Sequence, residues 1–189
     1  MDLHRDCRHE FIRAEKQKTL IMKGYRYRKV ELKRFYVTGL LYFITSVIEN
    51  REPIFINENC VQILPRVLNQ YARNCYIEII AFVVLPDHLH LHISPKSQNH
   101  TISAFMKSVK GKTAIEINRA LRRKGRLWQH QFLDHIVRSK EDYRCHIEYI
   151  HYNPIKHGLC DKPQDYRWSS YRFYELDEDV GVLINKMPI

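Results

Sequence analysis

Hydrophobic and polar positions alternate most clearly in residues 88–93, where histidine alternates with leucine or isoleucine. The preceding residues 76–84 are apolar almost throughout, as expected of a buried central strand, and a Leu-Pro-Asp turn signal separates the two segments. Because successive side chains of a strand point to opposite faces, His88, His90 and His92 share one face. The pattern predicts a hairpin whose second strand carries a row of imidazoles.

The rest of the chain alternates between segments of strand character and segments of helical periodicity. In chain order we expect a strand at 40–47, a helix capped by Asn57 and kinked near Pro65, a helix from about Thr101 to Leu121, a strand at 134–138, and a helix from a Ser139–Asp142 capping box to Asn153. Trp168 should begin an ordered extension. This order favours an α+β fold, a ferredoxin-like or RRM-like antiparallel sheet with helices packed mainly on one face.

The charge of the chain points to a polyanionic partner. Lys and Arg number 31 against 21 Asp and Glu, which gives a net charge of +10 at pH 7. Such an excess favours nucleic acid, the alternative being a solvated basic surface. The helix predicted from Thr101 has the most one-sided charge, and an N-terminal run at 23–29 places tyrosines between basic residues. The candidate DNA-contacting residues are Lys107, Lys110, Lys112, Arg119, Arg122, Arg123, Arg26 and Arg28.

A chain of 189 residues is expected to form one domain with extensions. We predict a basic N-terminal arm at 1–34, a core domain at 35–174 and a loose acidic tail at 175–189. The five cysteines are odd in number and form no CxxC pair, which argues against a disulfide framework and a zinc ribbon. With no apolar leader and no apolar run of membrane length, we expect a cytoplasmic protein with no membrane partner.

His88 and His90 offer two neighbouring imidazole nitrogens, which could begin a divalent metal site. Tyr149 and Asn153 are four residues apart, so they share one face of the last predicted helix. Asn153 could add an amide oxygen as a ligand, and Tyr149 a phenol that attacks a polarised phosphate and forms a phosphotyrosine intermediate. The alternatives are a structural histidine pair and a core tyrosine. The residues alone leave both interpretations open.

Three blocks of the sequence resemble the REP-associated tyrosine transposases, a branch of the single-tyrosine HUH transposases. The HUH signature is His-hydrophobic-His. The blocks are Val83–Leu91, Trp128–Arg138 and Tyr149–Leu159, followed by Trp168-Ser169-Ser170-Tyr171. Their joint order and spacing make the resemblance much more specific than a His-Leu-His motif alone.

The resemblance implies an endonuclease and strand transferase that acts on single-stranded DNA near palindromic hairpins. His88 and His90 match the metal ligands of the family, Asn153 the third, amide-bearing ligand, and Tyr149 the catalytic tyrosine. The implied cofactor is Mg²⁺ or Mn²⁺. The tyrosine becomes linked to the 5′ end of the cut strand and leaves a 3′ hydroxyl, whose reverse attack rejoins strands. The implied protein is nucleoid-associated and either a monomer or a homodimer.

The chain departs from the family pattern at three positions near the histidines. Asp87 and Leu85 replace the more usual Asn and Met, and His92 replaces an aliphatic residue, either as a spare ligand or as a residue that lines the site. Two other classes of protein stay open. One is a hairpin-binding protein that has lost cleavage, and the other is a zinc hydrolase that uses His88, His90 and His92 with water as the nucleophile.

Overall fold

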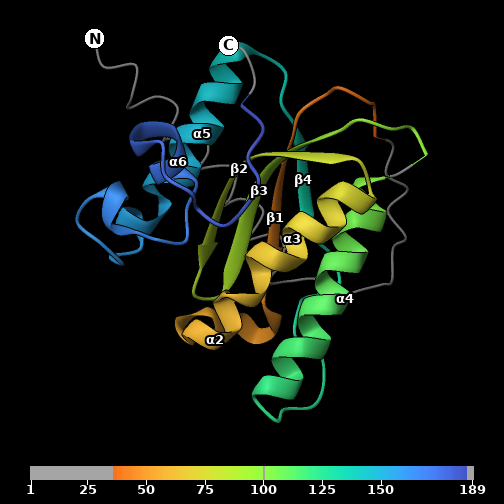
Figure 1. The fold of residues 1–189 in the computed structure, drawn as a ribbon, viewed down its shortest axis with the longest axis vertical. Coiled ribbons are helices and arrows are strands. Elements are labelled where there is room, and N and C mark those ends of the chain that lie inside the picture. Colours follow the sequence, from red (N-terminus) through yellow and green to blue (C-terminus); the bar gives the residue numbers. More distant parts are fainter. Residues whose placement is uncertain (1–35, 100, 187–189) are drawn as a thin grey trace, which may run out of the picture. The chain divides into compact units, whose positions relative to one another are not determined.

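The computed structural model describes residues 36–99 and 101–186, and their centre is an antiparallel four-stranded sheet (Figure 1). The strands are β1 (Tyr42–Val47), β2 (Ile77–Leu85), β3 (His88–Pro95) and β4 (Leu133–Ile136), in the spatial order β2-β3-β1-β4. The helices are α2 (Glu58–Val61), α3 (Ile63–Asn74), α4 (Ile102–Ala120), α5 (Lys140–Lys156) and α6 (Tyr171–Leu176), with 3₁₀ turns at Glu49–Arg51, Ile54–Ile56 and Pro163–Asp165. This ferredoxin-like arrangement confirms the predicted α+β class.

The alternation along β3 gives the sheet two chemically different faces. The leucine and isoleucine side chains of β3 join buried residues of α3 and α4 in the main hydrophobic core. The histidines of β3 stand in antiparallel register with Phe43, Thr45 and Val47 of β1 and point to the other face. Helix α5 lies on this histidine face and contacts β2 and β3 (Figure 1). The predicted row of imidazoles is therefore covered by the helix that carries the candidate nucleophile.

The helices begin at the side-chain caps that the sequence predicted. Thr101 and Ser139 each accept a hydrogen bond from the backbone N–H three residues on, at 3.1 Å, and so cap α4 and α5. Asn57 caps α2 through the N–H two residues on, at 3.0 Å. The break expected near Pro65 falls at Gln62, between α2 and α3. Pro65 lies in the first turn of α3, where helical N–H groups have no intrahelical acceptor.

Helix α5 is one turn longer than predicted. We expected it to end at Asn153, because a residue before proline usually leaves the helical region. Pro154 instead lies inside the helix, and the N–H of His157 donates to the carbonyl of Asn153 at 3.1 Å. Pro154 has no N–H to donate to the carbonyl four residues before it, so one intrahelical bond is missing, and both Asn153 and Pro154 are buried. Asn153 therefore keeps helical geometry.

Strand β2 is an edge strand, which corrects the prediction of a central one. It is nevertheless buried along its length because the chain from Tyr166 onward covers its free edge. There the N–H of Val84 donates to the carbonyl of Trp168, and the N–H of Ser170 donates to that of Phe82, both at 2.9 Å. This segment protects an edge that would otherwise be open to another strand. The ordered extension predicted at Trp168 is confirmed.

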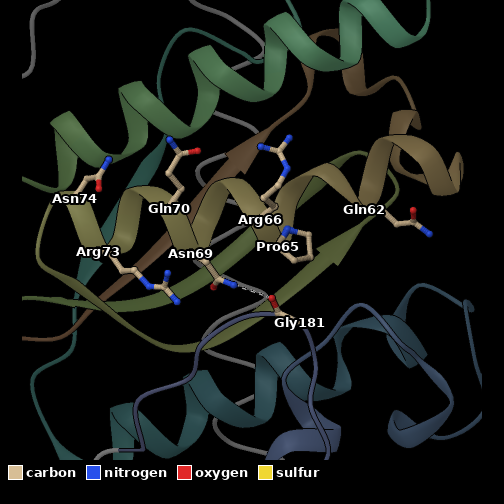
Figure 2. A pocket seen from close by; sticks show the side chains of 8 residues that line it. All are labelled: Gln62, Pro65, Arg66, Asn69, Gln70, Arg73, Asn74 and Gly181. Carbon is tan, nitrogen blue, oxygen red and sulfur yellow. Dashed lines mark hydrogen bonds between the residues drawn. The ribbon is translucent and has the colours of Figure 1, made fainter.

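The C-terminal residues through 185 are ordered, so the expectation of a loose acidic tail is wrong for that stretch. Val182 is buried, and the N–H of Asn185 donates to the carbonyl of Ile79 at 2.8 Å. Figure 2 shows Asn69 of α3 directed at Gly181, whose carbonyl accepts a 2.9 Å hydrogen bond from its side chain. Apolar and backbone contacts therefore attach the segment despite its acidic residues. The exact domain limits stay a prediction.

Two expectations drawn from composition can be compared with the described residues. Cys145 of α5 is disulfide-bonded, whereas Cys60, Cys75 and Cys160 are free. An odd cysteine count excludes complete pairing but not a single bond, so the absence of a framework does not mean that every thiol is free. Within the described part of the chain, no helix is both long and apolar enough to cross a membrane.

Burial of His151 should make the folded protein less stable in acid. The Nε2 atom of His151 lies 3.0 Å from the hydroxyl of Ser170, and burial lowers the pKa of His151 from 6.5 to about 4. Since the unfolded chain binds the proton at higher pH than the folded one, stability falls as pH drops from about 6.5 to about 4. We expect His151→Gln to reduce the difference in unfolding free energy between neutral pH and pH 4 by about 3 kcal/mol, measured with urea.

The control for this measurement is His130→Gln, because His130 is exposed in the loop before β4. Its unfolding free energy should show the same pH dependence as the unsubstituted chain. An equal acid-induced loss in His151→Gln and in the unsubstituted chain would contradict the assignment.

Candidate metal and nucleophile site

Helix α5 brings three side chains over the histidine face of β3. Tyr149, Asn153 and His157 are spaced four residues apart, so they form one stripe along the helix. The ring of Tyr149 lies 5.2 Å from that of His90, and the ring of His157 lies 5.5 Å from that of His88, between centroids. Asn153 is between Tyr149 and His157 on the stripe and so lies over the same histidine pair.

The side chain of Asn153 has the environment of a ligand. It is 1% exposed, and neither its Oδ1 nor its Nδ2 atom has a hydrogen-bond partner among the described residues. A buried amide without partners costs about 1–3 kcal/mol, so proteins seldom keep one without a function. Its oxygen is a suitable donor for a hard divalent cation. The residues therefore fit the metal that the family resemblance implies.

Both histidines of the pair are held through their Nδ1 atoms. The Nδ1 atom of His88 lies 2.5 Å from a carboxylate oxygen of Asp87, and that of His90 lies 2.9 Å from the hydroxyl of Thr45. The carboxylate of Asp87 can only accept, so the Nδ1–H of His88 donates to it and Nε2 of His88 carries the lone pair, while the hydroxyl of Thr45 orients the ring of His90. The Nε2 atom of His90 is buried and has no hydrogen-bond partner within residues 36–99 and 101–186.

The electrostatics of the site keep these groups in the forms that bind a cation. Burial, followed by the charge of neighbouring His88, holds the pKa of His90 well below its usual range, so its imidazole is neutral. Burial alone would raise the pKa of Asp87, but His88 and the guanidinium of Arg51 outweigh it and lower that pKa to about 2. The Nη1 atom of Arg51 lies 2.9 Å from the carboxylate. Asp87 is therefore ionised at neutral pH.

Tyr149 is half-buried between the sheet and a cation. Its ring packs edge-on against Phe43 at 5.8 Å between centroids, and the Nζ atom of Lys156 lies 5.1 Å from the ring centre. Phe43 thereby fixes the height of the phenol above the sheet. The ammonium of Lys156 can attract the negative charge of a phosphate or of a phenolate that forms beside it.

His92 shares the face of the sheet with His88 and His90 but belongs to a different group of side chains. Its ring packs against Tyr143 at 5.2 Å and against His146 at 5.9 Å, both nearer the start of α5. Because α5 runs antiparallel to β3, successive histidines of the strand meet successive turns of the helix in reverse order. The structure thus gives His92 neighbours other than Asn153 and Tyr149.

The basic residues of α4 lie on the side of the sheet away from the histidine face, because α4 packs on the apolar face. Lys107, Arg119 and Arg122 are exposed. The other three make contacts within the fold: Lys110 with the carbonyl of Gln129 at 2.6 Å, Lys112 with Glu116 at 3.2 Å, and Arg123 with Glu52 at 2.9 Å. Arg26 and Arg28 lie outside the described residues.

The C-terminal end of α4 nevertheless reaches the part of the sheet where the histidine strand begins. Arg123, just beyond α4, pairs with Glu52, and the adjacent Arg51 pairs with Asp87, each at 2.9 Å. Asp87 in turn holds His88. This line of contacts joins the basic end of α4 to the His88–His90 pair around one end of the sheet.

A polar groove of about 580 Å³ lies away from the candidate site, beside α3 (Figure 2). It runs along α3, which packs on the apolar face of the sheet, opposite the histidines. Its lining residues are Gln62, Pro65, Arg66, Asn69, Gln70, Arg73, Asn74 and Gly181. This groove is therefore separate from the candidate site.

Sequence reasoning missed four residues of the site. Thr45 and Phe43 alternate on β1, but only the strand register places them beside the histidines. Lys156 and His157 were placed beyond the predicted end of the last helix. Continuing the four-residue spacing past Pro154 would have added His157 to the stripe of Tyr149.

The contact between Asp87 and His88 can be tested by substitution. We expect Asp87→Ala to weaken Mn²⁺ binding by about 10–100-fold, because His88 loses the partner that orients it. The measurement is isothermal titration of the metal-free protein with Mn²⁺. Asp87→Asn is the matched control, since an amide oxygen can still accept from the Nδ1–H of His88. Equal affinities of the Ala variant and the unsubstituted chain would contradict this role.

Comparisons with known proteins show the family of the chain. Residues 36–153 match the family described as Transposase IS200 like. The REP-associated tyrosine transposase of Escherichia coli (strain K12) is 30% identical over 141 residues, which cover 75% of this chain and 82% of that protein. A solved structure of a REP-associated tyrosine transposase bound to a REP hairpin has a TM-score of 0.66 and 26% identity, covering 85% of this chain and 94% of that one. The chain therefore belongs to the IS200-like transposase family and, within it, to the REP-associated tyrosine transposases.

Proposed function

We propose that the chain cleaves and rejoins single-stranded DNA beside palindromic hairpins, with Tyr149 as the nucleophile and His88, His90 and Asn153 as ligands of Mg²⁺ or Mn²⁺. The observation that carries the proposal is the buried amide of Asn153, which has no hydrogen-bond partner among the described residues and lies one helical turn from Tyr149 on the stripe that meets the histidine pair. Membership of a transposase family implies cleavage of DNA in general. The side chains named here supply the specific mechanism.

In the proposed reaction the hydroxyl oxygen of Tyr149 attacks the phosphorus of the scissile phosphodiester. The bond from phosphorus to the 3′ oxygen breaks, the phenolic proton passes to solvent, and the departing oxygen takes up a proton to become a 3′ hydroxyl. The 5′ phosphate stays esterified to Tyr149. A bound divalent metal supplies polarisation of the phosphate oxygens. Attack by a 3′ hydroxyl on the phosphotyrosine reverses these bond changes and rejoins a strand.

The chain's own residues position this chemistry. Phe43 and His90 limit the tilt of the Tyr149 ring, and Lys156 attracts the charge of the phosphate. Thr45 and Asp87 orient the histidines, so the geometry exists before substrate binds. Preorganisation of this kind avoids a rearrangement at the moment of reaction.

The proposed DNA path follows the contacts between α4 and Asp87. A hairpin stem against the exposed side chains of Arg119 and Arg122 would bring the adjoining single strand around the end of the sheet to His88. Phosphates there meet basic side chains, which supply affinity without reading the sequence. REP hairpins are the proposed substrates because a relative of similar fold is bound to one.

The remaining parts of the chain complete the proposal. Residues 35–174 would form the transposase domain, residues 175–189 a C-terminal tail, and residues 1–34 a basic arm that also contacts DNA. Arg26 and Arg28 would provide the phosphate contacts of that arm.

The nucleophile can be identified by trapping it on DNA. A hairpin oligonucleotide with a labelled single-stranded flank, incubated with Mn²⁺, should give a protein–DNA adduct that survives denaturing electrophoresis. Tyr149→Phe should abolish the adduct, and Tyr152→Phe, which removes an exposed phenol from the same helix, should retain it. An adduct in the Tyr149→Phe variant would disprove the assignment. Binding of the hairpin without any adduct would favour a DNA-binding protein that has lost cleavage.

The DNA path can be tested through its salt dependence. Arg119→Ala and Arg122→Ala should each weaken hairpin binding, and each should reduce the slope of log K against log salt by about 1. Fluorescence anisotropy over a range of salt concentrations gives both quantities. Lys96→Ala is the control, since Lys96 pairs with Glu78 at 2.8 Å and lies at the other end of β3 from His88. An equal effect of all three substitutions would argue against a defined path along α4.

A further inference from the structure

A second group of metal-binding side chains lies where α5 begins beside β4. His135 of β4 and Asp142 and His146 of α5 place their ligand atoms within 4.8 Å of one another. The Nε2 atom of His135 lies 3.2 Å from one oxygen of Asp142, and the Nδ1 atom of His146 lies 3.0 Å from the other. We call these three residues the β4–α5 cluster. The cluster differs from the site of Tyr149 in its position and in its neighbour His92.

The cluster and the candidate site lie at different positions along α5. His146 and Asn153 are seven residues apart on α5, which corresponds to about 10 Å of helix. The ring of Phe43 stands between the groups, 4.6 Å from the ring of His146 and 5.2 Å from that of His90. An aromatic side chain therefore separates the β4–α5 cluster from the His88–His90 pair.

His92 of β3 is buried next to the β4–α5 cluster, against His146. Its ring is stacked on His146, with 5.9 Å between centroids and 12° between planes. It is completely buried, and neither of its nitrogens has a hydrogen-bond partner in the described part of the chain. An imidazole buried in this way costs free energy unless a ligand uses one of its nitrogens. A buried imidazole without a hydrogen-bond partner among the described residues thus lies next to the cluster.

We propose that the β4–α5 cluster binds a divalent transition metal through His135, Asp142 and His146, with His92 packed against His146. Two imidazoles with one carboxylate form a donor set that suits zinc, whereas Mg²⁺ prefers oxygen ligands. The backbone N–H of Arg138 donates to Asp142 at 3.0 Å, and the Nδ1–H of His146 donates to the carbonyl of Asp142 at 2.6 Å, which leaves Nε2 as the nitrogen of His146 that can bind a metal. Such outer contacts orient ligands around a metal.

The position of the cluster gives this metal a structural effect. Strand β4 has only four residues and is mostly exposed, and it pairs only with β1 in the sheet. A metal held by His135 and by two residues of α5 would join the edge strand directly to the helix that carries Tyr149 and Asn153. Metal binding would therefore stabilise the position of α5 on the sheet and resist its detachment.

Zinc titration of the full-length protein tests the proposal. After removal of metal with a chelator, equilibrium dialysis against Zn²⁺ should give two bound ions per unsubstituted chain. The double variant His88→Ala/His90→Ala should keep one, and adding His135→Ala should lower the affinity for that ion at least tenfold. Zinc should also raise the thermal midpoint of the double variant, and His135→Ala should abolish the rise.

The choice of His135 protects the test against a folding artefact, because its side chain is 43% exposed. Equal thermal midpoints with and without His135→Ala in the presence of chelator verify this. His130→Ala removes another exposed histidine nearby and should leave zinc binding unchanged. The proposal is overturned if the double variant binds no zinc, or if His135→Ala leaves its affinity unchanged. In either case the cluster is a hydrogen-bond network only.

Discussion

Helix α5 packs antiparallel to β3, and this packing brings one stripe of the helix over the histidines of the strand. The ring of Tyr149 lies 5.2 Å from that of His90, and the ring of His157 lies 5.5 Å from that of His88, between centroids. Because Asn153 is on the same stripe between Tyr149 and His157, the packing also directs its amide toward this pair. Every group of the proposed site depends on that packing.

The two faces of the sheet differ in role: one buries the main hydrophobic core, and the other carries the candidate site. On the apolar face, α3 and α4 bury the main core and can hold the sheet without help from charged groups. On the histidine face buried polar groups lie beside apolar ones such as Phe43, and burial of the polar groups costs free energy unless ligands meet them. The apolar face therefore offsets the cost of a functional one. In the proposed function, DNA would reach the second face at its end, where Arg51 and Asp87 meet, because α5 covers its centre.

Much of the fold followed from the sequence because its signals were local. Period-two alternation placed His88, His90 and His92 on one face, and the caps at Thr101 and Ser139 set two helix starts. The errors have non-local causes. The apolar sequence of β2 suggested a central strand, but a later segment of the chain buries its edge.

The candidate site was predictable in its residue types but not in its grouping. The four-residue spacing of Tyr149 and Asn153 predicted a shared helix face, and burial of Pro154 against the local rule extended that face to His157. Which histidine meets which turn depends on the direction in which α5 crosses the sheet. That direction assigns His92 to His146, and the register of β1 assigns Thr45 to His90. Neither contact can be predicted from one segment of the sequence alone.

The central claim is that His88, His90 and Asn153 form one metal site beside Tyr149. Anomalous diffraction from crystals soaked in Mn²⁺ tests it most directly. The account predicts a peak roughly 2.1 Å from the Nε2 atoms of both histidines and from the Oδ1 atom of Asn153. A fully occupied peak that leaves Asn153 out of the coordination shell, or no peak at the histidine pair, would contradict it.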